Sequence, residues 1–172
     1  GSRSGHVRIY QNNNGTWTQI GADIDGEASE DYSGKSVSLS DDGSVVAIGA
    51  YYNDGNGNNS GHVRIYQNDN GTWTQIGSDI DGEAADDHSG KSVSLSSDGS
   101  VVAIGGIQND GSGSNAGHVR IYQNDNGTWT QIGSDIDGEA ADDSSGTAVS
   151  LSSDGSVIAI SATLNDGTGN NS

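Results

Sequence analysis

The chain repeats itself every 56 residues, and this period constrains the fold more than any other feature of the sequence. The hexapeptide Gly-His-Val-Arg-Ile-Tyr begins at Gly5, at Gly61 and at Gly117, and the second and third copies differ at 11 of 56 positions. A long period of this kind indicates units that bury their faces against one another. We divide the chain into residues 1–4, interpreted as the remnant of a cloning tag, and repeats 5–60, 61–116 and 117–172.

Each repeat contains four segments that suit β-strands, and no segment has helical periodicity. In the second copy these segments are 62–68, 72–76, 91–96 and 101–105. The last of them is a continuous apolar run, which is typical of a strand covered on both faces. Asn70-Gly71 and Asp98-Gly99 supply positive φ and therefore predict two tight hairpins per repeat.

Composition narrows the class of protein. Only 30% of the residues are hydrophobic, and 28 glycines with no proline fit many short strands joined by turns. The net charge of −18 opposes binding to nucleic acid or to an anionic membrane, and no apolar run approaches the roughly 20 residues of a membrane span. The chain lacks cysteine, which excludes disulfides and thiolate metal sites.

Four antiparallel strands per repeat at this degree of repetition predict an all-β fold, a β-propeller with four-stranded blades. A β-solenoid is the alternative, although its rungs are usually shorter and lack two tight hairpins per turn.

The segment Ser89-Gly90-Lys91 through Val101-Val102-Ala103-Ile104-Gly105 resembles the FG-GAP repeat of integrin-type propellers. Ser33-Gly34 stands for the Phe-Gly pair, and Gly49-Ala50-Tyr51 stands for Gly-Ala-Pro. The chain is also similar to natural repeat proteins with near-identical blades and to engineered symmetric propellers of eight or nine blades. The calcium loop of the family is reduced here to Asp42-Gly43 and its copies, too short to supply six to eight oxygen ligands.

The resemblance implies that 91–96 is the first, inner strand of a blade. Complete blades then cover about 34–80 and 90–136, and a composite blade combines 146–162 with 5–24 of the next chain. Three blades are fewer than a closed propeller needs, and the half-blades at the two ends would leave strand edges unpaired. We therefore predict that the ring closes by oligomerisation of the chain with itself. A cyclic homotrimer gives nine blades and a homodimer gives six. Blade faces rich in Ser, Ala and Gly favour the larger ring.

Differences among the copies concentrate in the two long connections of each repeat, which emerge at the same mouth of a propeller channel. We predict a ligand-binding face there, although exposed loops also vary without any function. Lys35, Lys91 and Thr147 share one variable position. The candidate ligand-binding residues are Tyr32, His88, Ser144, Tyr51, Tyr52, Ile107, Gln108, Thr163 and Leu164.

Other repeated residues are interpreted as structural. Trp17, Trp73 and Trp129 are expected to anchor blades against each other, and Arg8, Arg64 and Arg120 to pair with carboxylates of neighbouring blades. His6, His62 and His118 are expected to make structural hydrogen bonds. The acidic segment 79–87 is interpreted as a solvated loop, with weak calcium binding as the alternative.

These observations predict a non-catalytic, self-assembling propeller module, either engineered or a fragment of a larger repeat protein. The alternative function is a secreted propeller that binds carbohydrate or protein at the channel mouth. No nucleophile elbow, phosphate loop or zinc spacing is present, so we expect no enzyme activity, no cofactor and no metal site. The compartment stays undetermined, while the resemblance implies a secreted or cell-surface natural parent.

Overall fold

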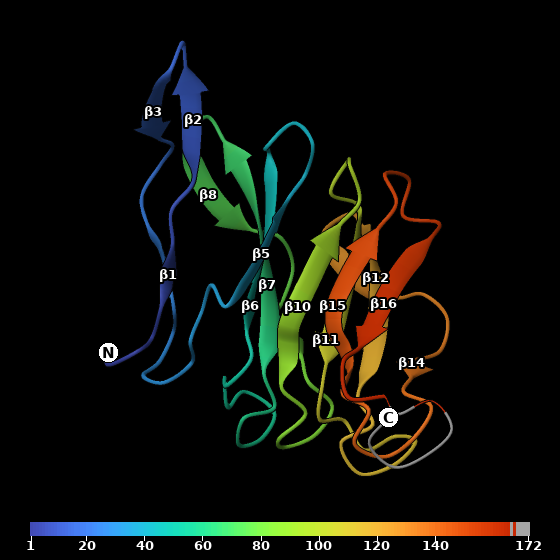
Figure 1. Cartoon of the computed structure of the whole chain (residues 1–172). Coiled ribbons are helices and arrows are strands. Elements are labelled where there is room, and N and C mark those ends of the chain that lie inside the picture. The colour runs from blue at the N-terminus through green and yellow to red at the C-terminus, as the bar shows by residue number, and fades with distance from the viewer. Residues whose placement is uncertain (166, 168–172) are drawn as a thin grey trace.

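The computed structural model describes residues 1–165 and 167, and within them the regular secondary structure consists of β-strands alone (Figure 1). Nothing in this part of the chain forms a helix long and apolar enough to cross a lipid bilayer. All the strand pairs between named strands are antiparallel. The predicted all-β class is confirmed.

Two complete sheets occupy the middle of the chain, and their strands follow one another in sequence order. The first sheet contains β5 (Ser36–Leu39), β6 (Val45–Ala50), β7 (His62–Asp69) and β8 (Thr72–Gln75). The second contains β10 (Ser89–Leu95), β11 (Val101–Gly106), β12 (His118–Asp125) and β13 (Thr128–Gln131). The four predicted strands of the second repeat are present, with ends shifted by one or two residues.

Each sheet also has a short fifth strand that the sequence did not predict. β9 (Ile80–Asp81) pairs with the start of β7, and β14 (Ile136–Asp137) pairs with the start of β12. β7 is twice as long as β8, so half of its outer edge is left for the following segment to pair with. The interpretation of 79–87 as a solvated loop is confirmed for residues 83–86, which are exposed, and is wrong for the strand β9 and for the buried side chains of Ile80 and Asp87.

The two ends of the chain form incomplete sheets, which lie at opposite ends of the row of sheets in Figure 1. The N-terminal end contains β1 (His6–Val7), β2 (Tyr10–Asn13), β3 (Thr16–Gln19) and β4 (Ile24–Asp25), paired as β1 with β4 and β2 with β3. The C-terminal end contains β15 (Ser145–Leu151) paired with β16 (Ile158–Ala162). The continuous strand of later copies is divided here into β1 and β2, which lack the neighbour that β6 provides to β7.

The sheets pack face to face through strands buried on both sides. Every residue of β6 and β11 is buried, as the apolar run predicted. Successive side chains of β6 point to opposite faces of the sheet. Val46 and Ile48 pack against the N-terminal strands, while Val45 and Ala47 pack against the second sheet. β10 contacts both β5 and β15, so the first strands of successive sheets lie beside one another.

The hairpins use the predicted turn residues. Asn70 and Gly71 both have positive φ, 49° and 91°, as a type I′ turn requires, and the Gly71 amide donates to Asn68 Oδ1 at 2.7 Å. In the other hairpin, Asp42 Oδ1 accepts hydrogen bonds from the Ser44 amide and from the hydroxyls of Ser44 and Ser40. These hydrogen bonds lower the pKa of the Asp42 carboxyl, and the bond from the Ser44 amide contributes most. The carboxylate therefore stabilises the turn in which it lies.

We expect Ile104→Ala to lower the free energy of unfolding by about 3 kcal/mol, because the side chain is 1% exposed and its removal leaves a cavity between two sheets. Urea unfolding at fixed protein concentration measures this loss. Thr74→Ala on the exposed outer strand is the control and should change stability by less than about 0.5 kcal/mol. Equal effects of the two substitutions would contradict the inter-sheet core.

Candidate functional site

The two long connections of each repeat meet at one end of the sheets, the lower end in Figure 1. The connection before β10 lies against the connection between β6 and β7, because the Asp86 amide donates to Asn58 O and the His88 amide to Asn59 O. The Gln108 amide in turn donates to Asp87 O. Loops of neighbouring repeats are thus joined by backbone hydrogen bonds.

Four of the nine predicted binding residues come together at this end and form what we call the aromatic cluster: Tyr32, Tyr51, Tyr52 and His88. The rings of Tyr51 and Tyr52 have centroids 4.1 Å apart, and Tyr32 lies 5.4 Å from Tyr52. His88 meets Tyr52 edge to face at 4.8 Å. Aromatic pairs at such separations attract one another, so the cluster is an ordered, half-buried surface.

Both lysines of the chain lie beside this cluster. Lys91 Nζ is 4.7 Å and Lys35 Nζ is 5.7 Å from the centre of the Tyr51 ring, within the range of cation–π attraction. Burial, and then the charge of Lys35, lower the pKa of Lys91. Burial, and then the neighbouring Tyr52, raise the pKa of Tyr51. Both lysines of a chain of net charge −18 therefore lie beside the aromatic cluster.

The backbone at the first variable position is left-handed in all three copies. Tyr32, His88 and Ser144 have φ values of 54°, 55° and 53°, which are uncommon for residues other than glycine. The preceding aspartate holds this turn, since buried Asp87 accepts hydrogen bonds from the amides of Glu83 and Ala84. The structural role of Asp87 was missed by the sequence analysis.

The other five predicted residues occupy the equivalent places in later copies without forming an aromatic group. Ile107 and Gln108 are half-buried, while Thr163 and Leu164 are exposed. Ser144 belongs to the third copy, where Thr147 Oγ1 lies 3.3 Å from Thr163 Oγ1. The structure therefore places all nine at one end of the sheets but brings only four into one cluster.

The repeated Trp and Arg residues connect neighbouring sheets. Trp73 Nε1 donates to Ile20 O, and Trp129 Nε1 donates to Ile76 O, both at 2.9 Å. Arg64 donates to Asp25 O at 2.8 Å, and its other terminal nitrogen is 3.5 Å from Glu27. Arg120 does the same with Asp81 and Glu83 of the preceding repeat. Trp17 and Arg8, which have no preceding repeat in the chain, are exposed.

The two junctions between successive repeats each contain a histidine facing two carboxylates. His62 Nδ1 lies 3.4 Å from Asp79 and 4.0 Å from Glu27, and His118 Nδ1 lies 3.4 Å from Asp135 and 3.8 Å from Glu83. Burial lowers the pKa of both histidines and therefore favours the uncharged imidazole, although the facing carboxylates oppose this shift. The donor set of each group could hold a metal ion.

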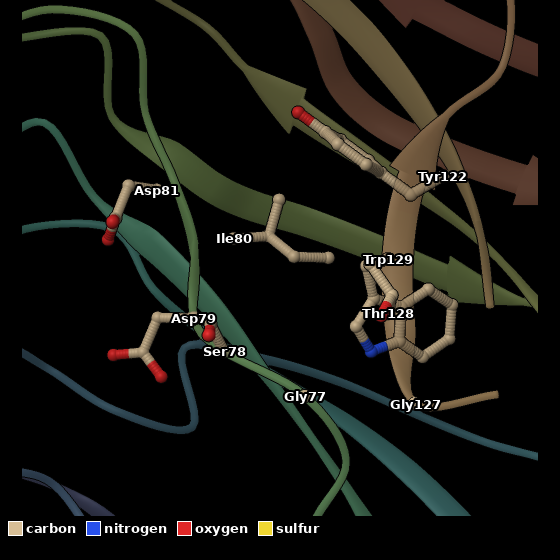
Figure 2. Close-up of a pocket in the computed structure, with 9 residues that line it drawn as sticks. All are labelled: Gly77, Ser78, Asp79, Ile80, Asp81, Tyr122, Gly127, Thr128 and Trp129. Atoms are coloured by element: carbon tan, nitrogen blue, oxygen red, sulfur yellow. The ribbon is translucent and has the colours of Figure 1, made fainter. Parts of the chain in front are cut away.

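A groove runs along the same junction, on the outer side of the sheets. Its cavity of about 340 Å³ is lined by Gly77–Asp81 of one repeat and by Tyr122 and Gly127–Trp129 of the next. Figure 2 shows the Ile80 side chain directed toward Trp129 and Tyr122, while the carboxylates of Asp79 and Asp81 face away. A similar cavity of about 350 Å³ lies one repeat earlier, between Ile24 and Trp73.

Comparison with known proteins supports the family resemblance. The FG-GAP repeat family matches residues 21–66, which contain β5, β6 and the first part of β7. A comparison with curated proteins gives no match. The resemblance of the chain to FG-GAP propeller repeats is thus confirmed over this segment.

Solved structures show the same fold at low identity. One, a candidate 6-phosphogluconolactonase from Bacteroides fragilis NCTC 9343, has a TM-score of 0.58 and 16% identity, over 92% of this chain and 36% of that chain. A second candidate 6-phosphogluconolactonase, from Bacteroides uniformis ATCC 8492, has a TM-score of 0.60 and 15% identity, over 91% and 41%. This chain spans about two fifths of their length, and the likeness concerns the propeller-like fold alone.

We expect Lys35→Gln to raise the pKa of Lys91, because the substitution removes a nearby like charge while burial is unchanged. NMR titration of the lysine side chains measures the shift. Glu30→Gln, which changes a charge that is paired with Arg3, is the control. A Lys91 titration unaffected by Lys35→Gln would show that the two ammonium groups do not share the site.

Proposed function

We propose that the chain is a non-catalytic β-propeller module that assembles with copies of itself into a closed ring. One observation carries the proposal: side chains that are buried in the middle of the chain are exposed at its ends. The exposed side chains form two surfaces, one at each end of the row of sheets, and a second copy of the chain would cover each of them. Further repeats of a longer protein would cover the same two surfaces. An engineered origin and excision from a larger repeat protein are both compatible with it.

The first exposed surface belongs to the N-terminal part. Val37 is 53% exposed and Leu39 is 49% exposed, whereas Val93 and Leu95, the same residues one repeat later, are 9% and 7% exposed. Trp17 is 65% exposed, while its copies are half-buried against the preceding repeat. Apolar side chains grouped in this way favour association, because covering them removes apolar area from water.

The second exposed surface belongs to the C-terminal part and is the complement of the first. Val157 is 66% exposed, although Val45 and Val101 are 6% and 7% exposed in the earlier copies. Val45 and Leu95 pack in one core, so by the 56-residue period Val157 of one copy would cover Leu39 of the next. The two surfaces match because the inner junctions already contain the same contact.

Hydrogen bonds repeat at the junctions in the same way. The Asp41 amide donates to Ser97 O, and the Ser97 amide donates to Ser153 O. The next member of this series would join the Ser153 amide to Asp41 O of a second copy. Likewise, Trp17 Nε1 would donate to Ile132 O of the preceding copy, as Trp73 and Trp129 do within the chain.

The ring that this contact generates contains three blades per chain. Each composite blade combines β15 and β16 of one copy with the N-terminal strands of the next, so the free edge of β16 pairs with β1 and β2. A homotrimer with nine blades and a homodimer with six both close. Small residues on the blade faces, such as Ala47 and Ala103 with 0% exposure, allow close packing and favour nine.

The absence of catalysis is part of the proposal, and the surroundings of the histidines support it. His62 and His118 face carboxylates, and His88 faces tyrosine rings, so the contacts of these three histidines do not include a serine or threonine nucleophile. The lactonase name belongs to the structural neighbours. At 15–16% identity it carries no residue of an active site onto this chain.

Native mass spectrometry and light scattering test the assembly. We expect a single species of about three times the 17.4 kDa chain mass, with a species of twice that mass as the six-bladed alternative. A monodisperse monomer would contradict the proposal, and a broad distribution of masses would indicate filaments instead of a ring.

A cysteine pair tests the contact itself, because the chain contains no cysteine of its own. Val45 pairs with Gln67, and Val101 with Gln123, so the ring places Val157 opposite Gln11 of the next copy. Oxidation of the variant with Val157→Cys and Gln11→Cys should yield covalent oligomers that end at the native ring size. Each single variant should give at most disulfide-linked pairs.

The aromatic cluster supports a second function, the binding of an acidic glycan or peptide. Three tyrosines and one histidine offer flat apolar faces with polar edges, and two lysines add the charge that attracts an anion. Exposed loops vary for many reasons, but two adjacent tyrosines and both lysines occur together only at this junction. The assignment to acidic ligands depends on the lysines.

We expect Tyr51→Ala with Tyr52→Ala to weaken binding of any acidic glycan or peptide identified on an array by at least about tenfold. Titration calorimetry measures the loss. Thr163→Ala with Leu164→Ala, at the same two positions of the third copy, is the matched control and should bind like the parent. Binding that survives the tyrosine substitutions would contradict this second function.

A further inference from the structure

The imidazole of His118 has a nitrogen whose surroundings suit a metal ion. The residue is 1% exposed, and its Nδ1 is buried without any hydrogen-bond partner. This nitrogen points at two carboxylate oxygens, Asp135 Oδ2 at 3.4 Å and Glu83 Oε2 at 3.8 Å. A buried polar atom without a partner is unfavourable, and a cation between the three atoms would satisfy it.

The spacing of the three atoms fits one ion. Zinc binds imidazole nitrogen and carboxylate oxygen at roughly 2.0–2.2 Å, which separates neighbouring ligands of a tetrahedron by about 3.4 Å. The separations at His118 are close to this value, and all ligand atoms of each group lie within 4.8 Å of one another. Small movements of the exposed glutamate would complete the site.

Neighbouring side chains help to orient the two carboxylates. Gln131 donates to Asp135 Oδ1 at 2.6 Å, and Arg120 lies 3.8 Å from Glu83 Oε1. The other oxygen of each carboxylate faces His118, and that of Glu83 also accepts a long hydrogen bond of 3.5 Å from Asn109. Partners that hold the far side of a ligand are characteristic of metal sites in proteins.

The same arrangement occurs one repeat earlier. His62 faces Asp79 and Glu27 at 3.4 and 4.0 Å, and Gln75 donates to the far oxygen of Asp79 at 2.6 Å. Glu27 and Glu83 each come from the repeat preceding the histidine, so both groups lie across a junction between sheets. The group is thus a property of the junction and not of a single loop.

We propose that each junction between repeats binds one divalent first-row transition-metal ion, of the Zn²⁺ or Co²⁺ class, through one glutamate, one histidine and one aspartate. Imidazole as a ligand favours these ions over Ca²⁺ and Mg²⁺, which prefer oxygen alone. Two carboxylates balance the charge of the ion, and water completes its coordination. Such an ion would join two sheets in addition to their apolar contact.

A third site would form only where two copies meet, and this part of the inference rests on the proposed ring. Its ligands are Glu139 of one copy with His6 and Asp23 of the next, by the 56-residue period. The two halves are held as in the inner sites: Gln19 donates to Asp23 Oδ1 at 2.7 Å, and Asn165 lies 3.5 Å from Glu139 Oε2, as Asn109 does from Glu83.

Two titrations of the protein in excess Ca²⁺ test the inference. Binding of Co²⁺ is measured by visible absorption, and binding of Zn²⁺ is measured by calorimetry. Calcium suppresses general binding to acidic loops. We expect three saturable sites per chain in the closed ring. Glu83→Gln, at a side chain 45% exposed, should remove one site, while Glu30→Gln should remove none.

The outcomes separate the metal sites from the ring. No saturable binding, or full binding by Glu83→Gln, would overturn the metal sites whatever the assembly. Two sites per chain in a protein of ring mass would overturn the site between copies. Two sites per chain in a monomer would support the inner sites and contradict the ring instead.

Discussion

The structure depends on a strand that is buried on both of its faces. In β6 the side chains of Val46 and Ile48 contact one neighbouring sheet, while Val45 and Ala47 contact the other. A sheet built around such a strand is incomplete with a single neighbour, because half of its apolar side chains would face water. Each sheet of the chain therefore needs a neighbour on both sides. The first and last sheets have a neighbour on one side only, so apolar side chains such as Leu39 and Val157 are exposed there. The inter-sheet hydrogen bonds of Trp73 and Arg64 form at positions that this packing brings together.

Much of the fold could be predicted from the sequence, because local patterns and the period carry the information. The apolar run 101–105, the Asn70-Gly71 turn and the strand order all follow from residues close together in the chain. The strand β9 could not be predicted in this way. It has two residues, and it exists because β7 extends past β8 and offers a free edge. The division of β1 from β2 likewise reflects a missing neighbour and not the local sequence, since residues 6–12 are identical to their equivalents in the later copies.

Of the two kinds of candidate site, one could be predicted from the sequence and the other could not. Tyr51 and Tyr52 were predicted because they vary among the copies, and the topology places loops of one type at one end. The groups around His62 and His118 were missed, since the glutamate lies 35 residues before each histidine and the aspartate 17 residues after it. Three residues so far apart, two of them acids in an acidic chain, have no local pattern. The identical spacing in both groups is the one signal that the sequence contains.

In this protein the packing between sheets repeats from copy to copy, whereas the side chains at the variable surface positions do not. The turn at residues 32, 88 and 144 has φ between 53° and 55° whether the side chain is Tyr, His or Ser. Its geometry is held by a buried aspartate and by backbone hydrogen bonds, as at Asp87, so the side chain at the variable position is free to change. Contacts between sheets have no such freedom, because each copy must fit both neighbours. A chain of this kind can acquire a distinct binding surface at one junction while every junction keeps the same packing and the same carboxylate–histidine group.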